Sequence, residues 1–263
     1  MKFFIDEIIQ IDEVREILIN DPENMKAKAK EIADNFIKTG VRSGENVGML
    51  PVFVLGYMCD YALSKYDERG VDREISLKTL RDINVWLQNY KNLHNEWGIW
   101  DFAYSWSFHA YTGDLFHLGR LQFRIEKVLN GVPSGEYGIE THIQQGAPLK
   151  VEDCLASFDM AREFFKKHFP EYSPEYFMCD SWLLNPNLEK IAPDSNITRF
   201  MKLWEKIEFP DDKNRQAVER IFGFFVTPED VLDFTPVTTL QKNAKEFLLS
   251  GGDLRMTAGY IKI

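Results

Sequence analysis

The chain has few cysteines, and none of them form a closely spaced pair. Cys59, Cys154 and Cys179 are the three in 263 residues, an odd number without a Cys-x-x-Cys sequence. This spacing argues against a disulfide framework and against a structural zinc site, so we expect reduced thiols and no metal. The sequences His-Glu-x-x-His, Gly-x-Ser-x-Gly and Gly-x-Gly-x-x-Gly and the P-loop are also absent, so none of these motifs identifies an activity.

Long hydrophobic runs are scarce as well. The longest apolar stretch, residues 49–58, contains Pro51 and is too short to span a bilayer. The first residues, Met-Lys-Phe-Phe-Ile, are followed at once by Asp6 and Glu7, so we expect no signal peptide. From these features we expect a cytoplasmic protein.

Positive charge is in deficit. The chain carries 31 Lys and Arg against 41 Asp and Glu, a formal net charge of −10. The acidic excess is shared equally by residues 1–112 and 113–263. Nucleic-acid backbones and anionic membranes repel such a chain, so we expect neither as a partner.

Aromatic residues are plentiful, and apolar residues repeat with a helical period through residues 1–112. Aromatics make up 14% of the chain, which favours compact, well-packed units. Steps of three and four predict helices, and Ser76 is the expected cap of the fourth. The expected ranges are 5–19 (one helix or two), 22–38 opened by Asp21 and Pro22 and stopped at Gly40, 51–64, 77–90 and 97–108.

The period changes from three or four to two after Gly113. Alternating residues predict strands over 119–126 and 139–143, joined as a hairpin by a turn-rich loop. Further expected elements are a helix over 151–169 with one apolar stripe that includes Cys154 and Leu155, a strand over 176–184 and a mainly helical stretch over 188–207. A strand over 221–226, a helix over 239–249 and a strand over 254–263 follow. This order predicts an α+β or α/β protein, with a helical domain (1–112) followed by a mixed β-sheet domain with flanking helices (113–263).

Several segments of the second half occur together in one known family. They are Leu118-Gly119-Arg120-Leu121-Gln122-Phe123, then His142-Ile143 with Gly146 and Pro148-Leu149, then Ser181-Trp182-Leu183-Leu184, Ser195-Asn196-Ile197 and Thr239-Leu240-Gln241. In this order they resemble bacterial N-acyltransferases, which pair a helical N-terminal domain with a GNAT-like C-terminal domain. The resemblance implies a GNAT-type fold, an acyl-coenzyme A donor and an amine acceptor.

The resemblance also implies where the donor binds. In GNAT folds two neighbouring parallel strands separate, and the acyl thioester lies in the gap. The pyrophosphate is held by backbone N–H groups where the first of these strands leads into a helix, whose N-terminus attracts anions. The matching cofactor-binding segment here is Gln144, Gln145, Gly146 and Ala147, ahead of the helix predicted from Val151.

Two groups of residues are candidates for the chemistry. Glu140 and His142 lie two apart on a predicted strand, so both leave the same face, and either could relay the proton of the attacking amine. The alternative is a solvated polar face. Asp180, Ser181 and Trp182 interrupt an apolar strand, which suggests an acceptor site or, equally, a buried and satisfied polar pair beside a core tryptophan.

The sequence thus favours a GNAT-like N-acyltransferase that uses acyl-coenzyme A and a small-molecule or peptide amine. A second reading stays open. In it, a GNAT-shaped protein has lost catalysis and serves as a binding module for a peptide, a metabolite or a partner protein.

Overall fold

The computed structural model describes residues 1–21, 24–44 and 46–263. The chain divides into two compact units. The helical unit comprises Met1–Leu118 together with Gln144–Gly146, and the sheet unit comprises Gly119–Ile143 together with Ala147–Ile263. The α+β class predicted from the sequence is confirmed, and so is the onset of strands after Gly113, because the first strand begins at Phe116.

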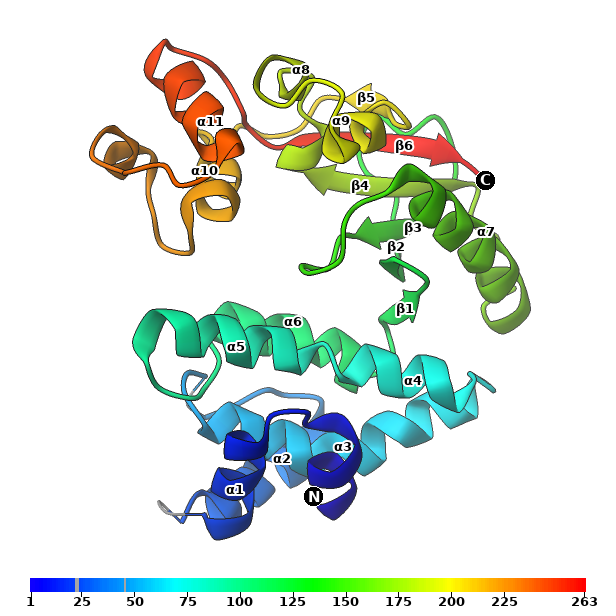
Figure 1. Ribbon diagram of the computed structural model, residues 1–263. Coiled ribbons are helices and arrows are strands. Elements are labelled where there is room, and N and C mark those ends of the chain that lie inside the picture. Colours follow the sequence, from blue (N-terminus) through cyan, green and yellow to red (C-terminus); the bar gives the residue numbers. More distant parts are fainter. Residues whose placement is uncertain (22–23, 45) are drawn as a thin grey trace. The chain divides into compact units, whose positions relative to one another are not determined.

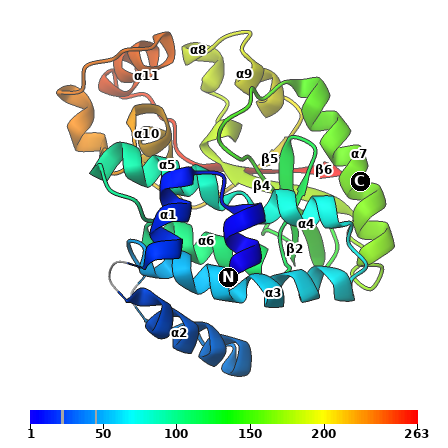
Figure 2. The same ribbon diagram turned by 60° about the horizontal axis from the view of Figure 1, so that its bottom comes forward.

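The helical unit consists almost entirely of short and medium helices. Its elements are a turn of π-helix (Phe4–Ile8), α1 (Asp12–Asn20), α2 (Met25–Thr39), α3 (Leu50–Glu68), α4 (Arg73–Leu80), α5 (Ile83–His94), α6 (Asp101–Tyr111) and the short strand β1 (Phe116–Leu118). Helix α3 is the centre of this unit, and α2 and α6 pack against it (Figure 2). Apolar residues lie on every side of α3, as expected for a helix that others surround.

Asp21 and Gly40 mark the two ends of α2. The Asp21 carboxylate accepts hydrogen bonds from the backbone N–H groups of Met25 (2.6 Å) and Lys26 (3.2 Å). Pro22, the other half of the predicted start signal, lies outside the described residues. Gly40 ends the helix as predicted, with a φ of 71° that glycine adopts without a steric cost.

The predicted fourth helix is wrong in its start and in its continuity. Its cap is Asp72, whose carboxylate accepts from the N–H of Glu74 at 2.8 Å, and Ser76 lies buried inside the helix. The helix then breaks into α4 and α5. The Arg81 side chain at the break donates to the carbonyl of Glu7 at 2.8 Å, a tertiary contact that periodicity could not reveal.

The sheet unit is a mixed sheet with helices around it. Its strands are β2 (Leu121–Lys127), β3 (Tyr137–His142), β4 (Tyr176–Ser181), β5 (Glu205–Ile207) and β6 (Thr257–Lys262), in the order β2-β3-β4-β6-β5. Strands β2 and β3 form the predicted antiparallel hairpin, β3 and β4 are parallel, and β6 is antiparallel to both β4 and β5. Figure 1 shows these strands, with β2, β3 and β4 in shades of green, β6 in red and β5 in yellow.

Helix α7 (Val151–His168) covers one face of the sheet. The ring of Phe158 lies 6.0 Å from that of Phe123 on β2 and 4.8 Å from that of Phe177 on β4, between ring centres. Most of the predicted apolar stripe is buried, including Cys154, but Leu155 is 47% exposed and does not belong to it. The aromatic contacts make this face the core of the unit.

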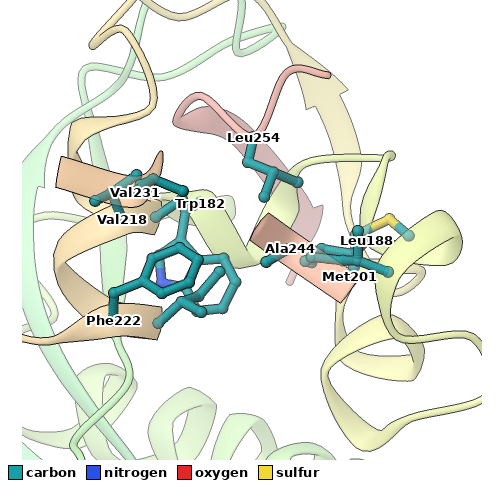
Figure 3. Close-up of a cluster of buried hydrophobic side chains, with 11 residues drawn as sticks. Trp182, Leu188, Met201, Val218, Phe222, Val231, Ala244 and Leu254 are labelled. Atoms are coloured by element: carbon teal, nitrogen blue, oxygen red, sulfur yellow. The ribbon is translucent and has the colours of Figure 1, made fainter. Parts of the chain in front are cut away.

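Helices follow β4 and form a second apolar cluster (Figure 3). They are η2 (Trp182–Leu184), α8 (Leu188–Ile191), α9 (Asn196–Met201), α10 (Arg215–Phe222), η3 (Pro228–Leu232) and α11 (Thr239–Leu249). The strand predicted over 221–226 is wrong, because Ile221 and Phe222 end helix α10 and pack into this cluster with Val218. Strand β5 was missed, since it lies within the stretch expected to be mainly helical.

Candidate active site

Two parallel strands separate in the middle of the sheet. The last ladder pair between β3 and β4 joins Glu140 to Met178, and among the described residues none follows it. Strand β3 nevertheless continues to His142 and β4 to Ser181, and each stays paired on its outer side, with β2 and with β6. Beyond Glu140 and Met178 the inner edges of β3 and β4 have no ladder partner in each other, and an extended ligand can form hydrogen bonds with strand edges of this kind.

A chain of charged side chains begins beside this gap. Glu140 and His142 leave β3 on one face, and Arg124 lies opposite Glu140 on β2. The Oε2 atom of Glu140 is 3.1 Å from Nε2 of His142 and 3.3 Å from Nε of Arg124. The carboxylate favours a proton on Nε2 of the imidazole and so favours Nδ1 as the nitrogen that accepts one.

Asp180 belongs to the same face, two residues after Met178 on β4. Burial raises the pKa of its carboxyl, the negative charge of Glu140 adds to this and His142 opposes it, and together they move the pKa from 3.8 to about 6. The influence of both charges shows that the structure brings Asp180, Glu140 and His142 together. A carboxyl that titrates close to neutral pH beside a gap is typical of functional sites.

Ser181 and Trp182, also predicted for the acceptor site, make other contacts. The Ser181 hydroxyl accepts from the N–H of Leu183 at 3.2 Å and starts the turn η2. The Trp182 N–H donates to Oε1 of Gln216 at 2.9 Å, and its ring lies in the apolar cluster of Figure 3. Ser181 therefore helps to end strand β4, and Trp182 packs among the helices that follow it.

The predicted cofactor-binding segment connects β3 to α7. In the helical unit, Gln144 donates to the Asp82 carboxylate, and Gln145 Oε1 accepts from Asn89 Nδ2 at 2.8 Å. Gly146 has a φ of 125°, which favours glycine. Ala147 is exposed and is the first of the four to belong to the sheet unit.

Arg120 adds a positive charge near the start of α7 that the sequence analysis did not assign. Its guanidinium donates to the carbonyls of Ala147 at 2.6 Å and Pro148 at 3.1 Å. Burial lowers the pKa of Arg120, and Asp153 in the first turn of α7 opposes this. No side chain caps α7. Arg120 follows Gly119, whose φ of 67° lets the turn approach Ser157 on α7, and this glycine was the available sequence signal.

Two further buried polar side chains near the gap were not predicted from the sequence. Gln122 and Thr141 are each only 2% exposed, and Nε2 of the former and Oγ1 of the latter have no hydrogen-bond partner in the described parts of the chain. Gln122 pairs with His142 across the hairpin, and Thr141 pairs with Phe123. The alternation along the two strands indicates the face on which each residue lies. It does not indicate that the residues are buried or that these atoms have no partner.

The cysteines are free and buried. Burial raises the pKa of the Cys154 thiol to about 11, that of Cys59 to about 12 and that of Cys179 well above its ordinary value. All three therefore stay protonated, whereas nucleophilic cysteines need a lowered pKa. The described residues contain no group of three or more His, Cys, Asp or Glu placed to hold a metal. None of the helices in the described residues has the length and apolarity to cross a bilayer.

Comparison with known proteins identifies both halves. The family model of the GNAT-like C-terminal domain matches residues 115–261, and that of the N-acyltransferase N-terminal domain matches residues 6–113. The chain belongs to the family of the GNAT-like C-terminal domain, with the helical N-acyltransferase domain before it. The family and fold predicted from the resemblance are thus confirmed. No curated protein matches the chain significantly.

Solved structures of an acyltransferase share the fold. One is a complex with decanoyl-CoA and teicoplanin, with a TM-score of 0.74 and 21% identity over 95% of this chain and 78% of that one. A mutant in complex with octanoyl-CoA has a TM-score of 0.73 and 22% identity over the same shares. A decanoyl-CoA complex has a TM-score of 0.72 and 23% identity, over 92% and 76%. At 21–23% identity, these matches show that the fold is shared.

Proposed function

We propose that this protein transfers an acyl group from acyl-coenzyme A to the amine of a small molecule or peptide. The observation that carries the proposal is the gap between β3 and β4, which opens after Glu140 and Met178 with His142 and Asp180 beside it. A gap between parallel strands leaves room for an extended thioester, and the polar groups on one face can handle a proton. The family and the acyl-CoA complexes of the similar structures support the same donor.

The donor's pyrophosphate would lie against the backbone of Gln144, Gln145, Gly146 and Ala147 at the start of α7. The first N–H groups of this helix have no side-chain cap, so they remain available to an anion. Arg120 donates to the carbonyl of Ala147, the last residue of this segment, and to that of Pro148, which follows it. It thereby holds the segment and adds a positive charge that partly offsets the acids of the first turn.

His142 would take the proton of the amine. As the amine nitrogen bonds to the thioester carbon, the N–H proton passes to the imidazole, and the carbon–sulfur bond then breaks to release coenzyme A. Glu140, 3.1 Å from Nε2, would orient the ring and stabilise the imidazolium that forms. A covalent route through cysteine is disfavoured, because the raised pKa of each thiol leaves almost no thiolate.

Asp180 would attract the ammonium form of the acceptor, which must release one proton to solvent before its nitrogen can attack. Its place on the same face as His142 supports this role, and its pKa of about 6 leaves it mostly charged at neutral pH. Ser181 and Trp182, proposed with it from the sequence, would shape this end of the site through the strand end and turn that they hold. We also propose that the functional domains are residues 1–112 and 113–263. A cytoplasmic location fits the free thiols of all three cysteines.

Binding and turnover test the proposal. Calorimetry of the full chain with coenzyme A, acetyl-CoA and octanoyl-CoA should show binding, and each bound ligand should raise the melting temperature. Release of the coenzyme A thiol in the presence of a panel of primary amines should then report transfer. Absence of binding at millimolar ligand would defeat the proposal. Binding without transfer to any amine would favour the binding-module alternative.

A further inference from the structure

Three buried side chains of the sheet unit carry a hydrogen-bonding atom without a partner. Gln122 Nε2, Thr141 Oγ1 and Trp204 Nε1 are in this state, within the parts of the chain that the structure describes. A buried polar atom left unpaired costs free energy, so each such atom needs an explanation, and a ligand that supplies the partner is one. The three differ in where they lie relative to the gap.

Of these three residues, only Thr141 lies on a strand segment that borders the gap. Trp204 is enclosed by the rings of Phe158 and Phe200, at 5.7 Å each between ring centres. Gln122 lies on β2, with β3 between it and the gap. Thr141 alone lies on the stretch of β3 that continues past the last ladder pair with β4. Of the three side chains, it is therefore the one carried by a strand that borders the opening.

The side chain of Thr141 points toward α7. Neighbouring residues on a strand leave opposite faces, so Thr141 points away from the face of His142. Its cross-strand partner is Phe123, whose ring packs against Phe158 of α7. An acyl-CoA whose pyrophosphate sits at the start of α7 would bring its thioester into the gap from this face. The amine would approach from the other face, where His142 and Asp180 lie.

We propose that the Thr141 hydroxyl donates a hydrogen bond to the thioester carbonyl oxygen of the acyl donor. The inference rests on the proposed function and assigns a group that the reaction needs. When the amine nitrogen bonds to the carbonyl carbon, the oxygen gains negative charge, and a donor already in place stabilises it. The bond shortens as charge develops and relaxes when the carbon–sulfur bond breaks, so the hydroxyl keeps its proton throughout. Desolvation strengthens it, since Thr141 is only 2% exposed.

The main test compares Thr141→Val with Thr141→Ser. The valine variant keeps the shape of the side chain and removes the hydroxyl. It should lower kcat for octanoyl-CoA by about 10- to 100-fold with KM changed less than twofold, while the serine variant keeps most of the activity. The melting temperature of the valine variant should not fall, because an unpaired hydroxyl gives the free protein no stability. Unchanged kcat, or equal losses in both variants, would overturn the proposal.

Thr198→Val is the matched control. Thr198 is also buried in the sheet unit, at 1% exposure, but its hydroxyl donates to the carbonyl of Ala192 at 2.6 Å. Its replacement should lower the melting temperature and leave kcat unchanged. If Thr141→Val destabilises the protein as much as Thr198→Val does, the Thr141 hydroxyl already has a protein partner and the proposal fails.

A spectroscopic readout separates this proposal from the proposed function. The infrared carbonyl band of octanoyl-CoA, labelled with carbon-13 at the thioester carbon, reports hydrogen bonding even when no acyl group is transferred. The band should lie at lower frequency in the parent protein than in Thr141→Val, and Thr141→Ser should resemble the parent. Equal band positions in the parent and the valine variant would refute the role of Thr141 alone, whereas failure to bind octanoyl-CoA would refute both proposals.

Discussion

The two faces of the sheet are made from the same strands and have opposite properties. On the face toward α7, Phe123 and Phe177 pack against Phe158. On the other face, Arg124, Glu140 and His142 form a chain of charged contacts. A strand alternates its side chains, so one stretch of sequence can build a rigid core on one face and a reactive site on the other. Stability should therefore depend mostly on one face and catalysis on the other.

The largest effect should come from the core face. Phe158→Ala should lower the free energy of unfolding by about 3–5 kcal/mol, because it removes a ring in contact with three aromatic neighbours and leaves a cavity. Chemical denaturation followed by tryptophan fluorescence measures this loss. Leu155→Ala is the control on the same helix; its side chain is 47% exposed, so the loss should be much smaller. Equal losses would contradict the buried core.

Substitutions on the charged face should affect catalysis more than stability. His142→Ala should lower kcat by about 100-fold or more through loss of the proton acceptor, with donor affinity nearly unchanged. Steady-state kinetics and calorimetry with octanoyl-CoA measure the two quantities. His168→Ala, at the far end of α7, should leave kcat unaltered. Wild-type turnover in the His142 variant would remove the residue from the mechanism and leave Glu140 or Asp180 as candidates.

Asp180 couples the charged face to stability. Its pKa is higher in the folded protein (about 6) than its ordinary value of 3.8, so the folded state binds the proton more tightly. Stability should therefore fall as pH rises from about 4 to 6, and Asp180→Asn should remove this part of the loss, about 1–3 kcal/mol at pH 7. Denaturation of both proteins at several pH values measures it. Asp159→Asn, an exposed carboxylate on α7, should leave the pH dependence unchanged, and identical profiles for parent and Asp180→Asn would contradict the raised pKa.

The smallest effect concerns the start of α7. Glu152 and Asp153 lie in its first turn, where they stabilise the helix but repel a phosphate, and Pro148 lacks an N–H to donate. Replacing both acids with Gln and Asn should tighten coenzyme A binding by about 0.3–1 kcal/mol per charge removed. Calorimetry at low salt measures this change. The double change Asp159→Asn with Glu163→Gln removes equal charge farther along the helix, and an equal gain there would show that only net charge matters.

Much of the molecule could be predicted from residue spacing. The apolar stripe of α7, the alternation in β2 and β3 and the Gly40 stop are local signals, and the structure agrees with each of them. Prediction failed where tertiary contacts compete with local pattern. Arg81 contacts Glu7 at the break before α5, and the pattern of residues 221–226 predicts a strand although Ile221 belongs to a helix packed into the cluster of Figure 3.

The candidate site also combines features that residue spacing predicts with features that depend on tertiary contacts. The spacing of Glu140 and His142 put both on one face of a strand, because alternation follows from backbone geometry alone. Their contact with each other, the proximity of Asp180 and the burial of Thr141 required β4 to lie beside β3, after a helix of 18 residues had intervened. By itself, the sequence determined which residues share a face. Only the tertiary structure decided which are buried, paired or left without a partner, since burial and pairing depend on neighbours far along the chain.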